Sequence, residues 1–98
     1  MAYKILFHPD IENDVNEIVE WYEMHQQFLG EKFLIELQIT FKKITAHPLY
    51  YKELKKNYRR ANLIVFPYQV VFKISKQTII ILMVFHQKRH PDIWKSRK

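Results

Sequence analysis

The chain has 98 residues, of which 48% are hydrophobic, so it can bury one compact core but has no room for a second domain. It has no cysteine, which excludes disulfide bonds and thiolate metal sites, and its longest apolar run, residues 79–85, is far shorter than the about 20 residues that span a bilayer. The net charge is +6. We therefore expect a single cytoplasmic domain over residues 1–98, without a signal peptide or membrane association.

Charge is divided unevenly along the chain. Residues 1–41 contain two lysines and eight carboxylates, a net charge of −6, whereas residues 42–98 contain fourteen lysines and arginines and two carboxylates, a net charge of +12. A surface built from the second part should attract a polyanion such as nucleic acid, or an acidic protein that competes for the same surface.

The first half of the chain predicts one strand and two helices. Residues 2–7 are mostly apolar and end at His8 and Pro9, which indicates a short strand. Apolar residues then recur at helical spacing over 11–22, opposite an acidic face, and again over 33–44. Gly30 between them is expected to take a positive φ in a helical hairpin turn. Ile35 and Ile39 lie off the apolar stripe of the second helix, so we expect them to face another element or a partner.

The second half changes to the periodicity of strands. Residues 49–57 are typical of a loop, and residues 59–66, 68–74 and 78–86 predict three strands. The last is apolar on both faces, as in an interior strand. The expected fold is α+β, with an N-terminal strand and a two-helix hairpin packed on a largely antiparallel four-stranded sheet. Residues 95–98 lack apolar anchors and are expected to be disordered.

The segment after the last strand is the first candidate site. It presents His86, Lys88, Arg89 and His90 at the end of a rigid element, where two imidazoles could transfer protons and a guanidinium could hold a phosphate. Arg59 and Arg60 could converge on the same surface. The alternative is that these are solvated basic residues and that Trp94 only anchors the tail by packing.

The loop over residues 50–60 is the second candidate site. It alternates aromatic and basic residues, which suits stacked bases flanked by neutralised phosphates, although a solvated loop with tyrosines covering the core is the alternative. We expect no metal and no cofactor. His86 and His90 would face one metal only on a helix, which Pro91 disfavours there, and no third ligand is evident.

Several short motifs occur in an order that resembles the RelE/ParE superfamily of bacterial toxins, and more closely its plasmid-stabilisation branch. The motifs are Trp21-Tyr22-Glu23, Gly30-Glu31-Lys32-Phe33, His47-Pro48, Arg59-Arg60, Phe66-Pro67-Tyr68, and Val84 to Pro91 followed by Trp94. The resemblance implies a toxin of a type II toxin–antitoxin system, paired with a cognate antitoxin that wraps it. It also implies two helices on a largely antiparallel sheet. A homodimer and a hetero-oligomer with the antitoxin are both left open.

The superfamily implies two activities. RelE-like members cut mRNA on the ribosome without metal, and the resemblance assigns His86 as the acid or base, His90 as a second proton-transfer group, and Arg60 and Arg89 to the phosphate. The accompanying RNA contacts would be Lys55, Lys56, Tyr58, Arg59, Lys88 and Trp94; Trp94 stands where the best-known nucleases have Tyr or Phe. ParE-like members inhibit DNA gyrase by binding. Ribosome-dependent cleavage is our first expectation; gyrase inhibition and an inactive binding module are the alternatives.

Overall fold

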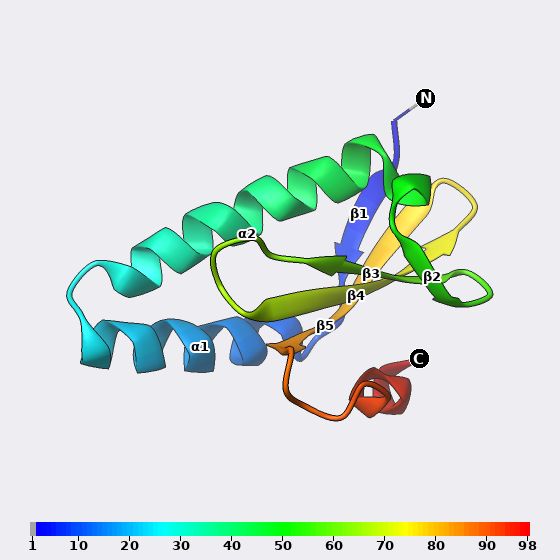
Figure 1. Cartoon of the computed structure of the whole chain (residues 1–98). Helices are drawn as coiled ribbons and strands as arrows, with labels where there is room; N and C mark the ends of the chain where they lie inside the picture. The colour runs from blue at the N-terminus through cyan, green and yellow to red at the C-terminus, as the bar shows by residue number, and fades with distance from the viewer. Residues whose placement is uncertain (1) are drawn as a thin grey trace.

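The structure is a computed structural model that describes residues 2–98, and it forms a helical hairpin packed on a sheet (Figure 1). The turn between the two helices projects beyond the sheet at one end of the molecule (Figure 1). The C-terminal segment lies on the side of the sheet away from α2 (Figure 1). The elements in chain order are β1 (Lys4–Phe7), α1 (Ile11–His25), α2 (Leu29–Ala46), the 3-10 helix η1 (Pro48–Tyr50), β2 (Lys52–Lys55), β3 (Tyr58–Asn62), β4 (Tyr68–Ser75), β5 (Thr78–His86) and the 3-10 helix η2 (Ile93–Arg97).

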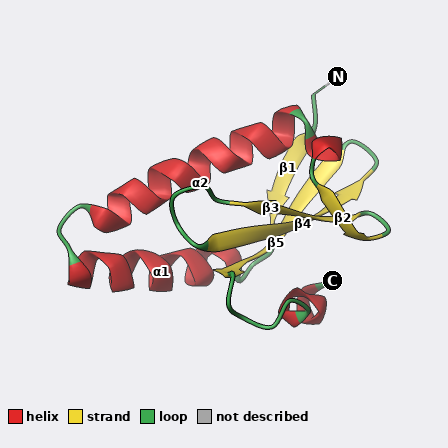
Figure 2. Cartoon of the chain, in the orientation of Figure 1, coloured by secondary structure: helices red, strands yellow, loops and turns green. Residues whose placement is uncertain are grey.

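The predicted α+β fold is confirmed, with one more strand than expected. The sheet has five strands in the order β1-β5-β4-β3-β2; β1 is parallel to β5 and all other pairs are antiparallel (Figure 2). The extra strand, β2, lies in the segment that we expected to be a loop. Its sequence, Lys-Glu-Leu-Lys, lacks strand-like alternation because β2 is an edge strand, where lysines are common.

Strand β5 is interior, as its apolar sequence predicts. β1 pairs with residues 78–81 of β5 and β4 pairs with its full length. Val71 pairs with Met83 while Phe72 pairs with Ile81, so Leu82 is an extra residue in β5 and forms a β-bulge. Beyond the bulge, the outer edge of β5 is no longer covered by β1.

The sheet buries a separate apolar cluster on each face. The face under the helices, which we call the helix face, includes Phe33, Leu37, Phe72 and Ile81. The opposite face, which we call the open face, carries a smaller cluster of Val71, Leu82, Met83, Phe85 and Trp94. Because residues facing each other across a ladder share a face, these clusters decide on which face each candidate site residue lies.

Gly30 does not have the role that the sequence suggested. The prediction of a positive φ is wrong: in residues 2–98 no glycine has a positive φ, and Phe28 takes that conformation instead, with φ 69°. Gly30 is buried inside α2, where an added Cβ would lie 2.7 Å from the Val19 carbonyl oxygen of α1. The Glu23 carboxylate accepts the Gly30 N–H at 2.7 Å and the Phe28 N–H at 3.1 Å. The glycine therefore allows the two helices to approach closely.

The C-terminal segment is ordered, so the prediction of disorder over residues 95–98 is wrong. Residues 93–97 form η2, and the apolar anchor is Trp94, which is 1% exposed. Arg97, although charged, is held by α1 and β5. No helix in the described part of the chain is both long and apolar enough to cross a membrane.

Candidate functional site

A groove of about 500 Å³ lies between α1 and the segment that follows β5. Its walls include Glu17 and Trp21 from α1, Tyr68 from β4, and His86 and Arg89 from the end of β5. The groove exists because β1 stops opposite Ile81, which leaves the second half of β5 without a strand on its outer side. The structure therefore brings His86 and Arg89 together in one concave site, as predicted.

His86 is held in a defined orientation at the end of β5. It lies opposite Tyr68 in the sheet, with ring centroids 5.1 Å apart at 74°. Its Nδ1 accepts the Lys88 N–H at 3.0 Å, and its carbonyl oxygen accepts the Arg89 N–H at 2.9 Å. Since Nδ1 is an acceptor, the neutral ring carries its proton on Nε2. The Nε2–H can therefore donate a hydrogen bond, but Nε2 cannot accept a proton while the ring is neutral.

His90 is exposed and repeats this local arrangement. Its Nδ1 accepts the Asp92 N–H at 3.1 Å, and His8 accepts the Asp10 N–H at 3.0 Å in the same way. Both histidines stand in the sequence His-Pro-Asp, ahead of a helix. His90 is thus part of the turn that begins η2, and it does not line the groove.

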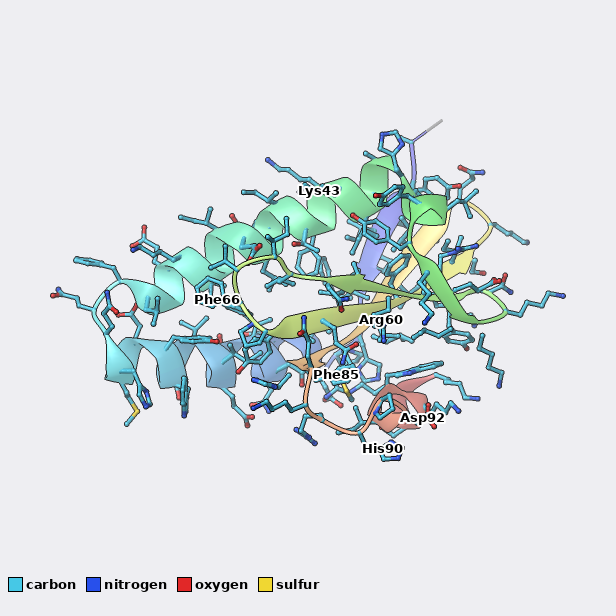
Figure 3. The ribbon with its side chains drawn as sticks, in the orientation of Figure 1. Lys43, Arg60, Phe66, Phe85, His90 and Asp92 are labelled. Carbon is cyan, nitrogen blue, oxygen red and sulfur yellow. The ribbon has the colours of Figure 1, made fainter. Side chains whose placement is uncertain are left out.

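Arg60 lies on the other face of the sheet from His86. Arg60 is opposite Val71, a member of the open-face cluster, whereas His86 is opposite Tyr68, whose ring contacts Tyr22 and Phe33 on the helix face. Figure 3 shows Arg60 on the same side of the sheet as Phe85 and η2. The structure does not bring Arg60 together with His86 and Arg89.

Two of the residues predicted to contact RNA make contacts within the protein instead. Trp94 is 1% exposed and its ring lies 5.0 Å from that of Tyr58, so the indole has no free face on which a base could stack. Arg59 has a side chain that is 18% exposed; its Nη1 donates to the Tyr51 carbonyl oxygen at 2.7 Å and its Nη2 lies 3.7 Å from Glu53. Lys55, at the end of β2, and Lys56 and Lys88, in turns, remain exposed.

The described residues contain no group of three or more histidines, aspartates and glutamates that could hold a metal ion. His86 and His90 thus have no third ligand beside them. The groove itself offers two carboxylates, one imidazole and two guanidinium groups.

Comparison with known proteins identifies the family. The family model of the ParE toxin of type II toxin-antitoxin systems, parDE, matches residues 5–91. The chain belongs to this family. A solved structure described as the chromosomal ParDE TA system from P. aeruginosa superposes with a TM-score of 0.75, covering 86% of this chain and 95% of that chain at 14% identity, which supports the same fold. No curated protein matches the chain in sequence.

Membership in the ParE family makes this protein the toxin of a type II toxin–antitoxin pair with a cognate antitoxin as its partner. The toxin exposes an apolar surface over α2 and the β3–β4 loop that is typical of protein-binding sites. Ile35 and Ile39 are 50% and 47% exposed, and Ile64 and Val65 are 81% and 78% exposed. Ile35 and Ile39 are thus half exposed within residues 2–98, and their contact with a partner stays a prediction.

One carboxylate of the toxin that the sequence analysis did not single out shapes this surface. The Glu36 side chain accepts the backbone N–H groups of Ile64, Val65 and Phe66 at 2.8 to 3.2 Å. These bonds hold the β3–β4 loop against α2. Nothing in the sequence signals them, because Glu36 and the loop are about 30 residues apart.

A second set of contacts that the sequence did not reveal closes one side of the groove. Arg97 donates to both carboxylate oxygens of Asp14 and, at 3.0 Å, to the Leu82 carbonyl oxygen. Asp14 also accepts the Val84 N–H at 3.2 Å. Hydrogen bonding to Asp14 raises the pKa of Arg97, against the opposing effect of burial. Leu82 is the extra residue of the bulge, so one of these contacts is made at the bulge itself.

Proposed function

We propose that this ParE-family toxin arrests growth by binding DNA gyrase, not by cutting RNA. The observation that carries the proposal is the position of Arg60 and His86 on opposite faces of the sheet. A metal-independent ribonuclease needs a base, an acid and a cation within hydrogen-bond reach of one phosphodiester. Of the four residues that the RelE resemblance assigned to these roles, only His86 and Arg89 share a site, and Arg60 and His90 lie outside it.

The hydrogen bonding of His86 also supports a binding function. With Nδ1 accepting the Lys88 N–H, the neutral imidazole offers only a donor to the groove. In this tautomer Nε2 has no lone pair with which to deprotonate a 2′-OH, and a neutral imidazole does not protonate a leaving group. Trp94, which stands in place of the nuclease aromatic residue, is buried against Tyr58 and is not available to orient a base.

The test is a pair of assays with the same purified toxin. We expect a supercoiling reaction with DNA gyrase to be inhibited in proportion to toxin concentration. We expect mRNA in a purified translation reaction to keep its 5′ ends intact. New ends in codon register that require ribosomes, with gyrase unaffected, would overturn the proposal. Neither gyrase inhibition nor mRNA cleavage, together with no growth arrest on expression without antitoxin, would identify an inactive binding module.

Ribosome-dependent RNA cleavage is the second candidate, because the groove holds three suitable groups. Glu17, His86 and Arg89 line the same concavity, and they could act as base, acid and phosphate ligand respectively. Under this alternative, Glu17→Gln and His86→Ala each abolish the new mRNA ends, while Glu20→Gln, an exposed neighbour on α1, has no effect. Under the gyrase proposal, no mRNA ends form with any of these proteins.

A further inference from the structure

The open face of the sheet carries a group of cations that is separate from the groove. Cross-strand pairs place Lys52 beside Arg60, and place Lys55 and Lys73 on either side of Tyr58. Residues paired across a ladder project from the same face, and these rows include Val71 of the open-face cluster. Three adjacent strands, each about 4.8 Å from the next, therefore present basic side chains to one side of the molecule.

We propose that this basic face, formed by Lys52, Lys55, Arg60, Lys73 and Lys98, binds the phosphate backbone of a nucleic acid. Phosphate contacts carry no sequence information but supply affinity and position the protein along the strand. The proposal does not depend on gyrase being the target of the toxin. Such a face would serve a toxin that acts on gyrase engaged with DNA, and equally one that acts on mRNA.

The carboxylates of the basic half of the chain do not neutralise this face. Glu53 points to the opposite side from its neighbours: it lies 3.7 Å from Arg59 and accepts the Asn57 N–H at 3.2 Å. Asp92 lies 3.4 Å from Lys95. Glu53 and Asp92 are the only acidic residues after position 41. The positive field of the face is therefore left for an external anion.

Lys98 joins this face through the position of η2. Trp94 packs on Tyr58, which brings the C-terminus of the chain next to β2. There the Lys98 side chain lowers the pKa of Lys55, first through a side-chain hydrogen bond and then through repulsion between the two charges. A bound phosphate would offset the repulsion between the two ammonium groups.

The arrangement favours backbone contacts over base contacts. Of the aromatic side chains on this face, Phe85 is buried, and Tyr58 and Trp94 are packed against each other. Lys73 Nζ lies 5.6 Å from the centre of the Tyr58 ring. Little aromatic surface is therefore left for stacking, which is the usual anchor of single-stranded bases. Binding should thus be independent of sequence and strongly dependent on salt.

The experiment measures fluorescence anisotropy of a labelled duplex DNA and of a labelled single-stranded RNA as purified toxin is added, between about 50 and 200 mM salt. Each phosphate contact contributes about −0.9 to the slope of log K against log salt for duplex DNA and about −0.7 for a single strand. Lys52→Ala, Arg60→Ala and Lys73→Ala should each reduce the magnitude of this slope by about 1 and weaken binding to every sequence alike. The two nucleic acids distinguish the DNA source from the RNA source.

Lys42→Ala and Lys43→Ala are the matched controls, because they remove the same charge from exposed positions of α2. Figure 3 shows Lys43 on α2, away from Arg60. They should leave both slopes unchanged. Equal effects of the controls and the open-face variants would overturn the proposal, as would no binding of either nucleic acid at low salt. Unchanged nucleic-acid affinity with lost inhibition of gyrase would also overturn it, by making the face a protein-binding surface. Circular dichroism confirms that each variant is folded.

Discussion

Arg97 and Asp14 lie 83 residues apart in the sequence and form a two-pronged ion pair that joins the C-terminus to the first turn of α1. Their side chains are 15% and 13% exposed, and Arg97 Nη2 lies 2.8 Å from Asp14 Oδ1. Because both charges are largely removed from water, the attraction between them is what offsets the desolvation cost of each.

Removing one partner of this pair should destabilise the toxin strongly. We expect Arg97→Ala to lower the free energy of unfolding by about 3 kcal/mol, because it leaves Asp14 as a largely buried charge without its cation. Urea denaturation measures the change. The control is Lys95→Ala, since the pair of Lys95 with Asp92 has side chains 47% and 55% exposed and should be worth no more than about 1 kcal/mol. Equal effects of the two substitutions would contradict this account.

Gly30→Ala should destabilise the toxin even though alanine normally favours a helix. The new Cβ would lie 2.7 Å from the Val19 carbonyl oxygen, and backbone cannot move aside cheaply. We expect a loss of about 1 to 3 kcal/mol, the range found for overpacked cores, in place of a gain of up to about 1 kcal/mol from helix propensity. Thermal or urea unfolding shows whether the free energy of unfolding falls or rises. The control is Asn16→Ala on the exposed side of α1, whose free energy of unfolding should stay within about 0.5 kcal/mol of that of the parent protein.

Glu36→Ala should release the β3–β4 loop. The substitution removes the acceptor of three backbone N–H groups, those of Ile64, Val65 and Phe66. We expect amide hydrogen exchange at these three positions to accelerate, with a loss of stability of about 1 to 3 kcal/mol. Glu31→Ala, at an exposed position of the same helix, is the control. Unchanged exchange at residues 64–66 would show that the loop is held by its other contacts.

The stability of the toxin should fall at high pH through Tyr22. Burial, with a smaller effect of Tyr68, raises the pKa of Tyr22 from 10.0 to about 12. A raised pKa means that the folded state holds its proton more tightly than the unfolded state, so stability is full below about pH 10 and declines toward pH 12. The slope from this one group is at most about 1.4 kcal/mol per pH unit. In urea titrations at pH 9 to 12, Tyr22→Phe should make the fall of the free energy of unfolding with pH less steep. An unaltered slope would mean that other groups cause this fall.

The sequence determined the two helices, the three main strands and the interior position of β5, because apolar periodicity reports burial directly. It also placed His86 and Arg89 side by side, since both follow the end of one strand. It could not determine β2, an edge strand in which pairing with β3 outweighs the weak preference of its own residues.

Only the tertiary structure decided which face of the sheet each cation occupies. A bulge at Leu82 shifts the alternation of β5, so His86 faces the helices while Arg60 on β3 faces away from them. Local sequence carries no record of such a shift, because a change of register by one residue reverses the face of every side chain that follows. The contacts of Asp14 with Arg97 and of Glu36 with the β3–β4 loop depend in the same way on residues that only folding brings together.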